Sequence, residues 1–167
     1  MATVKQTLEP ADAQLPTGNP AAPVLVQGTN FPVAGLAFDA TTQEAAYFLF
    51  NATNYGSGNI TCTVQWYADT ASTGGVVWEA ALAAITADTD TQDIETKAFA
   101  TAQQASDTHL GTTGQRLHTM AVTVSNLDSI AADDYVCLRI RRVPADASDT
   151  MTGDAILVRA ILSYSDT

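Results

Sequence analysis

Histidine is the residue type best suited to acid–base and nucleophilic chemistry, and this chain has only two histidines. No G-x-S-x-G elbow or other local nucleophile motif accompanies His109 or His118. A Ser-His-Asp assembly formed by the fold stays open, because such a triad is recognised by geometry and not by sequence position. We expect His109 to lie in a loop and His118 to open a strand at the surface or rim, with no catalytic role for either.

Carboxylates are plentiful, but their spacing does not fit a metal site. The acidic loop Asp88–Asp93 has the D-x-D spacing that opens a calcium loop. It lacks the glycine at the sixth position, and Phe99 stands where the bidentate glutamate is required. Asp146, Asp149 and Asp154 form a looser set of the same kind. We therefore expect solvated turn aspartates, with no bound metal and no cofactor.

The two cysteines, Cys62 and Cys137, lie singly in separate strand-like runs, which excludes a zinc pattern. Free cysteine is among the most buried residue types. The first residues lack the basic and apolar regions of a secretory signal. We expect two buried free thiols rather than a disulfide, in a chain that is made and folded in the cytoplasm.

Glycoside hydrolysis requires a pair of carboxylates, and sugar binding favours exposed aromatic rings. Glu79 is the one acid inside a well-defined strand pattern, and its face is opposite that of Trp78. We expect Glu79 to be a surface or interface residue. Trp66, Tyr67 and Trp78 are the candidates for a sugar platform, although packing of the tryptophans in the core is favoured. From these residues we expect that the chain is not an enzyme.

Four of the seven cationic residues are arginines in the C-terminal third, at positions 139, 141, 142 and 159. Arg139 and Arg141 share one face of a predicted strand, and Arg159 belongs to a strand that is able to lie beside it. One interpretation pairs them with the abundant aspartates. The other places Arg139, Arg141 and Arg159 in contact with another subunit, because arginine is favoured at interfaces.

Prolines are concentrated at the N-terminus. Five of the six lie in the first 32 residues, and each X-Pro step favours extended backbone. We predict an extended Pro-rich arm over residues 1–32 and a β-sandwich domain over residues 33–167. Ordering an arm costs conformational entropy, so we expect it to lie against another subunit through Pro10, Pro16, Pro20 and Pro23. A disordered tail is the alternative.

Strand patterns dominate the remaining chain. Ile60–Tyr67, Leu117–Val124 and Tyr135–Val143 alternate apolar and polar residues with the period of two that is typical of half-buried strands. Val76–Ile85 favours a strand, with an amphipathic helix as the alternative. About eight strands without a βαβ rhythm predict an all-β fold, an antiparallel β-sandwich of jelly-roll type. An immunoglobulin-like sandwich is the second choice.

Charge excludes some partners. The formal net charge of −11 repels the phosphate backbone, so we expect no nucleic-acid ligand. No apolar run approaches the roughly 18 residues of a membrane span, so we also expect no membrane partner.

Two long stretches resemble jelly-roll virion structural proteins of tailed bacteriophages, namely head decoration (cement) proteins and tail-appended proteins. They are YFLFNATNYGSGNITCTVQWYADTASTGGVVWEAAL and DYVCLRIRRVPADASDTMTGDAILVRAILSY. The shared elements are a strand ending in Trp, a Gly turn, a V-x-W strand, an Arg-bearing strand, an Asp-Thr loop and a final strand ending in Tyr. The resemblance covers residues 45–164 and excludes the arm.

This resemblance implies a non-enzymatic capsid decoration protein. It would be a homotrimer that binds the major capsid protein or other virion subunits, in a virion assembled in the host cytoplasm, and that stabilises the assembled lattice. The alternative is a receptor- or carbohydrate-binding module of a tail or fibre protein. That alternative predicts an exposed aromatic cluster beside polar loops.

Overall fold

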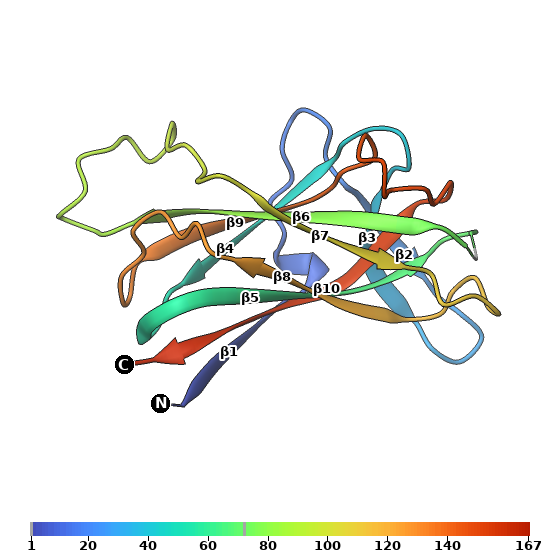
Figure 1. The fold of residues 1–167 in the computed structure, drawn as a ribbon, viewed down its shortest axis with the longest axis horizontal. Helices are drawn as coiled ribbons and strands as arrows, with labels where there is room; N and C mark the ends of the chain where they lie inside the picture. Colours follow the sequence, from blue (N-terminus) through green and yellow to red (C-terminus); the bar gives the residue numbers. More distant parts are fainter. Residues whose placement is uncertain (1, 72) are drawn as a thin grey trace.

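The computed structural model describes residues 2–71 and 73–167, and over this part of the chain it contains ten β-strands and one 3-10 helix, η1. The strands form two antiparallel sheets packed face to face, and the two termini lie side by side (Figure 1). The elements are β1 (Thr3–Leu8), η1 (Pro10–Asp12), β2 (Ala22–Val26), β3 (Val33–Phe38), β4 (Ala45–Asn51), β5 (Tyr55–Ala68), β6 (Gly75–Ile85), β7 (Gln103–Thr108), β8 (His118–Val124), β9 (Tyr135–Arg142) and β10 (Ala155–Asp166).

Sheet A has the strand order β2-β3-β10-β5-β8, with β1 also paired to β10, and sheet B has the order β4-β9-β6-β7. The predicted all-β antiparallel sandwich is therefore confirmed. The alternative of a helix over Val76–Ile85 is wrong, because these residues form β6 between β7 and β9. The described residues contain no helix that is long and apolar enough to cross a membrane.

The core lies between the sheets and is filled by the inward residues of each alternating strand. Trp66 of β5 and Trp78 of β6 approach each other across it, with 6.5 Å between ring centroids. Phe38 packs edge-on against Trp78 at 5.1 Å. All three side chains are fully buried. The two tryptophans are thus core residues, as the sequence favours, and neither is available to a ligand at the surface.

The Pro-rich leader, residues 2–32, runs along the sheets of its own chain. β1 pairs with β10, and β2 pairs with β3. Between these strands, the backbone of Gln14 exchanges hydrogen bonds of 2.7 and 2.9 Å with that of Tyr47 on the open edge of β4. The leader is extended, as expected, but its order comes from its own chain where the sequence suggested a neighbouring subunit. Backbone hydrogen bonds offset the entropy of ordering it.

The four leader prolines that we assigned to an interface lie in different settings. Pro10 is at the start of η1, Pro16 is half-buried, and Pro20 forms a bridge with Ala45. Pro23 lies in the exposed edge strand β2, where a proline withholds one donor from further strand pairing. Their contact with another subunit and the division of the chain at residue 32 stay predictions.

Arg142 at the end of β9 points into the core, although the sequence groups it with surface arginines. Its guanidinium pairs with Asp149 at 2.7 Å, and both side chains are buried. It also donates to the carbonyl oxygens of Met151 and Gly153 at 2.6 and 2.8 Å. Since Asp149 accepts a 3.0 Å bond from the Val77 N–H as well, this ion pair ties the loop 143–154 to β6.

Asp149→Asn leaves the Arg142 charge buried without its counter-ion, which costs about 3–5 kcal/mol for a buried pair. We expect the free energy of unfolding to fall by this amount in urea denaturation followed by tryptophan fluorescence. Arg116→Gln, at an exposed arginine, is the control and should change it by less than about 0.5 kcal/mol. An unchanged midpoint for Asp149→Asn would show that the pair does not hold the loop.

Candidate functional site

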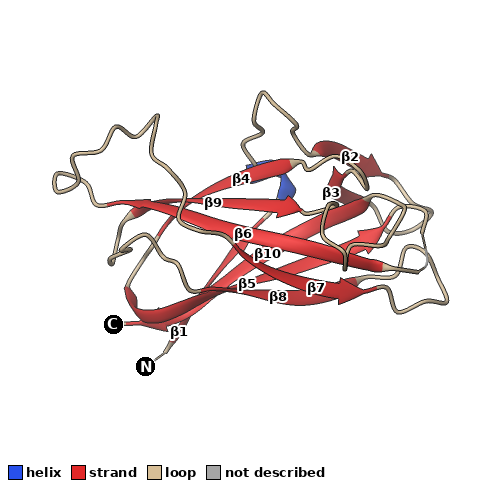
Figure 2. Ribbon diagram, turned by 45° about the horizontal axis from the view of Figure 1, so that its top comes forward, coloured by secondary structure: helices blue, strands red, loops and turns tan. Residues whose placement is uncertain are grey.

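The outer face of sheet B is hollowed where its central strand carries small side chains. In β6, Trp78, Ala80 and Leu82 point into the core, so Ala81 and Ala83 point outward. On the adjacent β9, Cys137 lies opposite Ala83. Larger side chains rise around this floor from β4 and from the loop 86–102, which extends beyond the end of sheet B (Figure 2). The result is a groove of about 400 Å³, the sheet B groove.

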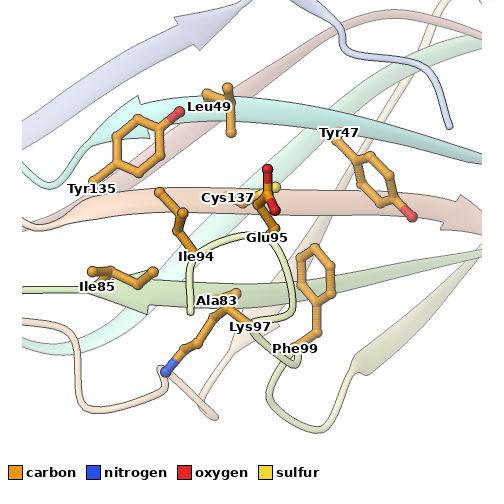
Figure 3. Close-up of a pocket in the computed structure, with 10 residues that line it drawn as sticks. All are labelled: Tyr47, Leu49, Ala83, Ile85, Ile94, Glu95, Lys97, Phe99, Tyr135 and Cys137. Atoms are coloured by element: carbon orange, nitrogen blue, oxygen red, sulfur yellow. The ribbon is translucent and has the colours of Figure 1, made fainter. Parts of the chain in front are cut away.

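The lining of the sheet B groove comes from three strands and one loop, and it is mostly apolar (Figure 3). The loop contributes one carboxylate and one ammonium group, and three aromatic rings stand around the alanine and cysteine floor. The lining residues are Tyr47 and Leu49 from β4, Ala83 and Ile85 from β6, Tyr135 and Cys137 from β9, and Ile94, Glu95, Lys97 and Phe99 from the loop.

The three rings differ in how firmly they are held. Phe99 and Tyr47 stack with 5.7 Å between centroids and 19° between planes. The Arg139 guanidinium lies 4.8 Å above the centre of the Phe99 ring, a favourable cation–π distance. Tyr135, at the other end of the groove, is 45% exposed. The groove therefore has one rigid aromatic wall and one accessible tyrosine.

Glu95 and Lys97 face different surroundings. The Lys97 ammonium pairs with Asp128 at 3.0 Å and points away from the groove (Figure 3). The Glu95 carboxylate points into the middle of the groove (Figure 3), and no ion pair involves it within the described residues. The groove thus presents one negative charge that is free to accept hydrogen bonds.

Glu79 lies on the outer face of β6, as expected, but it is buried, with 5% of the residue exposed. Arg141 Nε donates to its carboxylate at 2.8 Å, Arg139 Nη2 at 3.3 Å and Gln104 Nε2 at 3.1 Å. The two arginines therefore pair with a glutamate of their own sheet rather than with aspartates. Burial, with the charge of Arg141 beside it, lowers the pKa of Arg139. Whether the predicted interface residues Arg139, Arg141 and Arg159 contact another subunit stays a prediction.

The two cysteines are free thiols, as the sequence predicts. Cys62 is buried in sheet A, where desolvation raises its pKa to about 12. Cys137 is half-buried in the groove floor, and desolvation raises its pKa to about 11 against an opposing effect of Arg139. Both thiols are therefore protonated near neutral pH, and Cys137 is not an activated nucleophile.

The two histidines are buried together, so the expected surface position of His118 is wrong. The rings of His109 and His118 lie 4.5 Å apart, and His118 stacks on Trp66 at 4.4 Å. His109, in a loop as predicted, accepts a bond from the Gly111 N–H and contacts the Gly114 carbonyl, both at 2.9 Å. These bonds give His109 a structural role in holding the loop 109–117.

The acidic loop expected to carry turn aspartates does so. Asp90 accepts a 3.0 Å bond from the Thr86 N–H, and Asp93 accepts a 2.9 Å bond from the Glu95 N–H. These local bonds shape the loop that carries one wall of the groove. Asp149, from the second acidic set, is instead a buried partner of Arg142.

The aromatic residues of the sheet B groove are not among the site residues predicted from the sequence. Tyr47 and Leu49 alternate with the buried Phe48 and Phe50, so their outward position is readable from the period of two. Tyr135 likewise alternates with the buried Val136. Phe99 lies in the loop, and no periodic pattern in the sequence places it against Tyr47.

No family model and no curated protein sequence matches this chain. The family 11 carbohydrate-binding module of the cellulosomal cellulase Lic26A-Cel5E of Clostridium thermocellum aligns with a TM-score of 0.52 and 10% identity, over 97% of this chain and 95% of that chain. A family 11 module from the same organism, in complex with a β-1,3-1,4-mixed-linked tetrasaccharide, aligns with a TM-score of 0.46 and 10% identity, over 96% of this chain and 87% of that chain. The likeness to the first structure shows a shared β-sandwich fold.

The buried position of His118 predicts a pH dependence of stability. Desolvation lowers the pKa of His118 below its usual value of 6.5, as do the charges of His109 and Arg116, while Asp107 opposes the shift. Just below that pH the unfolded chain binds more protons than the folded chain, so stability is lost as the pH falls. As the pH falls, the loss of stability begins near the pKa of His118 in the unfolded chain and continues through its lower pKa in the folded chain.

We expect the free energy of unfolding to decrease between about pH 7 and pH 5.5, a range above the titration of ordinary carboxylates. In His118→Phe, which keeps a ring against Trp66 without a titratable group, the decrease should be smaller. Urea denaturation at stepped pH values measures both profiles. A wild-type profile that is flat over this range would contradict the assignment.

Proposed function

We propose that this protein is a non-catalytic carbohydrate-binding module whose saccharide ligand occupies the sheet B groove. The observation that carries the proposal is the composition of that groove, in which three aromatic rings, an apolar floor and one carboxylate share a single cavity. Sugar rings have apolar C–H faces and hydroxyl-bearing edges, so their binding sites need ring surfaces and hydrogen-bonding groups side by side.

The groove supplies both kinds of contact. Tyr135 offers an accessible ring face on which a sugar ring can stack. The Glu95 carboxylate points into the same groove and can accept hydrogen bonds from sugar hydroxyls (Figure 3). Because Phe99 already contacts both Arg139 and Tyr47, this wall needs little ordering when a ligand binds, which favours affinity.

The acidic groups favour binding over hydrolysis. Glycoside hydrolysis uses two carboxyl groups that flank the scissile bond. Glu95 is the one acid among the described residues that line the groove, and Glu79 is buried between two arginines. The net charge of −11 and the Glu95 carboxylate also disfavour anionic polysaccharides. The proposed ligand class is therefore a neutral saccharide.

The structural comparison supports the proposal at the level of the fold. The family 11 carbohydrate-binding module with a TM-score of 0.52 is a β-sandwich that aligns over nearly the whole of both chains. This chain therefore has an architecture that is known to host such a function, and the location of the proposed site depends on its own residues.

Removing the accessible ring should weaken saccharide binding. A panel of soluble neutral oligosaccharides, including the β-1,3-1,4-mixed-linked tetrasaccharide, first identifies a ligand by isothermal titration calorimetry. We then expect Tyr135→Ala to raise its dissociation constant at least about fivefold, because a ring contact contributes about 1 kcal/mol. Phe31→Ala, which removes an exposed ring from the loop between β2 and β3, is the matched control and should bind normally. Equal loss in both variants, or none in Tyr135→Ala, would contradict the location.

Cys137 provides a reporter within the groove floor. Its raised pKa, about 11, makes alkylation by iodoacetamide slow near neutral pH. At about pH 8.5, we expect saturating oligosaccharide to slow the alkylation of Cys137 at least about fivefold, since the ligand covers the thiol. Mass spectrometry of the peptide measures the rate, and Cys137→Ser identifies its signal. Unchanged alkylation with ligand bound would place the ligand elsewhere.

Capsid decoration in a virion is the second function that we propose, as a trimer that contacts the major capsid protein. It rests on the resemblance to phage structural proteins, and the exposed apolar side chain of Leu25 favours it because such groups mark protein contacts. Co-sedimentation with assembled phage capsids tests it. Binding to capsids without binding to any oligosaccharide of the panel would favour this function over the first.

A further inference from the structure

A second apolar surface lies on the outer face of sheet A. Ala37, Tyr67 and Ile156 form a small cluster there that is separate from the main core. Next to it, Val158 and Arg159 lie where β10 has left β3 and begins to pair with β1, and the strand bulges at this point. A cavity of about 540 Å³, the sheet A cavity, opens here.

The rim of the sheet A cavity is unusually apolar for a solvated surface. Phe31 is 79% exposed, Leu117 57% and Val26 44%, and all three line the cavity. Elsewhere on the same face β5 presents Thr61 and Thr63, as a strand facing water should. Exposed apolar groups gathered at one place mark a contact surface.

Two opposite charges border this apolar surface. Arg159 lines the cavity, is partly exposed and lies 3.9 Å from Glu9, a loose surface pair. Asp69 lines the same cavity, and no ion pair involves its carboxylate within the described residues. In a chain with a net charge of −11, the cavity therefore has a balanced pair of charges at its border.

We infer that the occupant of this surface is a second copy of the chain, related by a two-fold axis. A two-fold contact uses the same patch on both copies, so the patch must complement itself. The patch complements itself in shape, because it offers both a protruding ring, Phe31, and an apolar hollow that receives the ring of the partner. The patch also complements itself in charge, because Arg159 of each copy meets Asp69 of the other.

The arrangement has a consequence that rests on the proposed function. Contact through the outer faces of sheet A leaves both sheet B grooves on opposite outer surfaces of the dimer, since the two sheets of each copy pack face to face and the groove lies on the outer side of sheet B. Two grooves on one particle increase the apparent affinity for a multivalent polysaccharide without new contacts, because the second binding event is intramolecular. The dimer itself does not require that the grooves bind sugar.

A charge-swap series tests the inference, with the oligomeric state of the full chain measured by sedimentation velocity over a concentration range. We expect the wild-type chain to be a dimer at tens of micromolar. Asp69→Arg or Arg159→Asp alone places like charges opposite each other and should raise the dimer dissociation constant at least about tenfold. The double variant restores opposite charges and should recover dimerisation. Phe31→Ala should weaken it as well.

Leu15→Arg is the matched control, because it adds a charge at an exposed apolar residue outside this surface. It should remain dimeric, and thermal unfolding should show that every variant is folded. A wild-type chain that stays monomeric would overturn the inference. So would a trimer, which a two-fold contact cannot form, or a double variant that dimerises no better than the single ones. Sugar binding by a monomer would leave the proposed function intact.

Discussion

The burial of strand β6 along nearly its whole length is the constraint on which both faces of sheet B depend. Every residue from Gly75 to Ala84 is buried, so the outward residues of this strand must be covered as well as the inward ones. Sheet A covers the inward set around Trp78. The outward set includes Glu79, whose carboxylate is costly to bury without a partner, and Arg139 and Arg141 supply that partner.

This local requirement extends to the groove. Arg139 is held by Glu79 on one side and lies above Phe99 on the other, and Phe99 in turn stacks on Tyr47. A charge that is compensated within the sheet thereby fixes an aromatic wall at the surface. The small outward residues of the same strand leave the floor open beside that wall. The burial of Glu79 and the open floor of the sheet B groove therefore both follow from the alternation of side chains along β6.

The acidity of the chain reflects how its turns and strand ends are built. Asp128 accepts a bond from the Ala84 N–H at 2.9 Å and Asp149 one from the Val77 N–H at 3.0 Å, both on β6. Asp39 accepts bonds from Thr41 and Thr42, which lower its pKa to about 2. Aspartate suits these places because its short carboxylate reaches nearby backbone N–H groups. The net charge of −11 is thus largely explained by aspartates that shape turns and strand ends, and it does not require a basic partner.

The sequence predicts the sandwich well because its strands obey a period of two. Val136, Leu138 and Ile140 are buried and Cys137, Arg139 and Arg141 face outward, as the pattern requires. It could not predict that Arg142, next in the inward set, is stabilised by Asp149 seven residues later, since that pairing depends on how a loop folds. It also could not join Phe99 to Tyr47, or His109 to His118, because contacts made by loops have no periodic signal.

The leader shows what composition alone leaves open about such a segment. Its prolines predict extended backbone correctly, but extended backbone is also what an open sheet edge can accept. Gln14 and Pro20 bridge to Tyr47 and Ala45 on β4, the edge strand of sheet B, and so cover an edge that is otherwise free to pair with another chain. Tyr47 is also part of the rigid aromatic wall. Residues far from the groove in sequence therefore contribute to its shape, because they hold the strand from which Tyr47 projects.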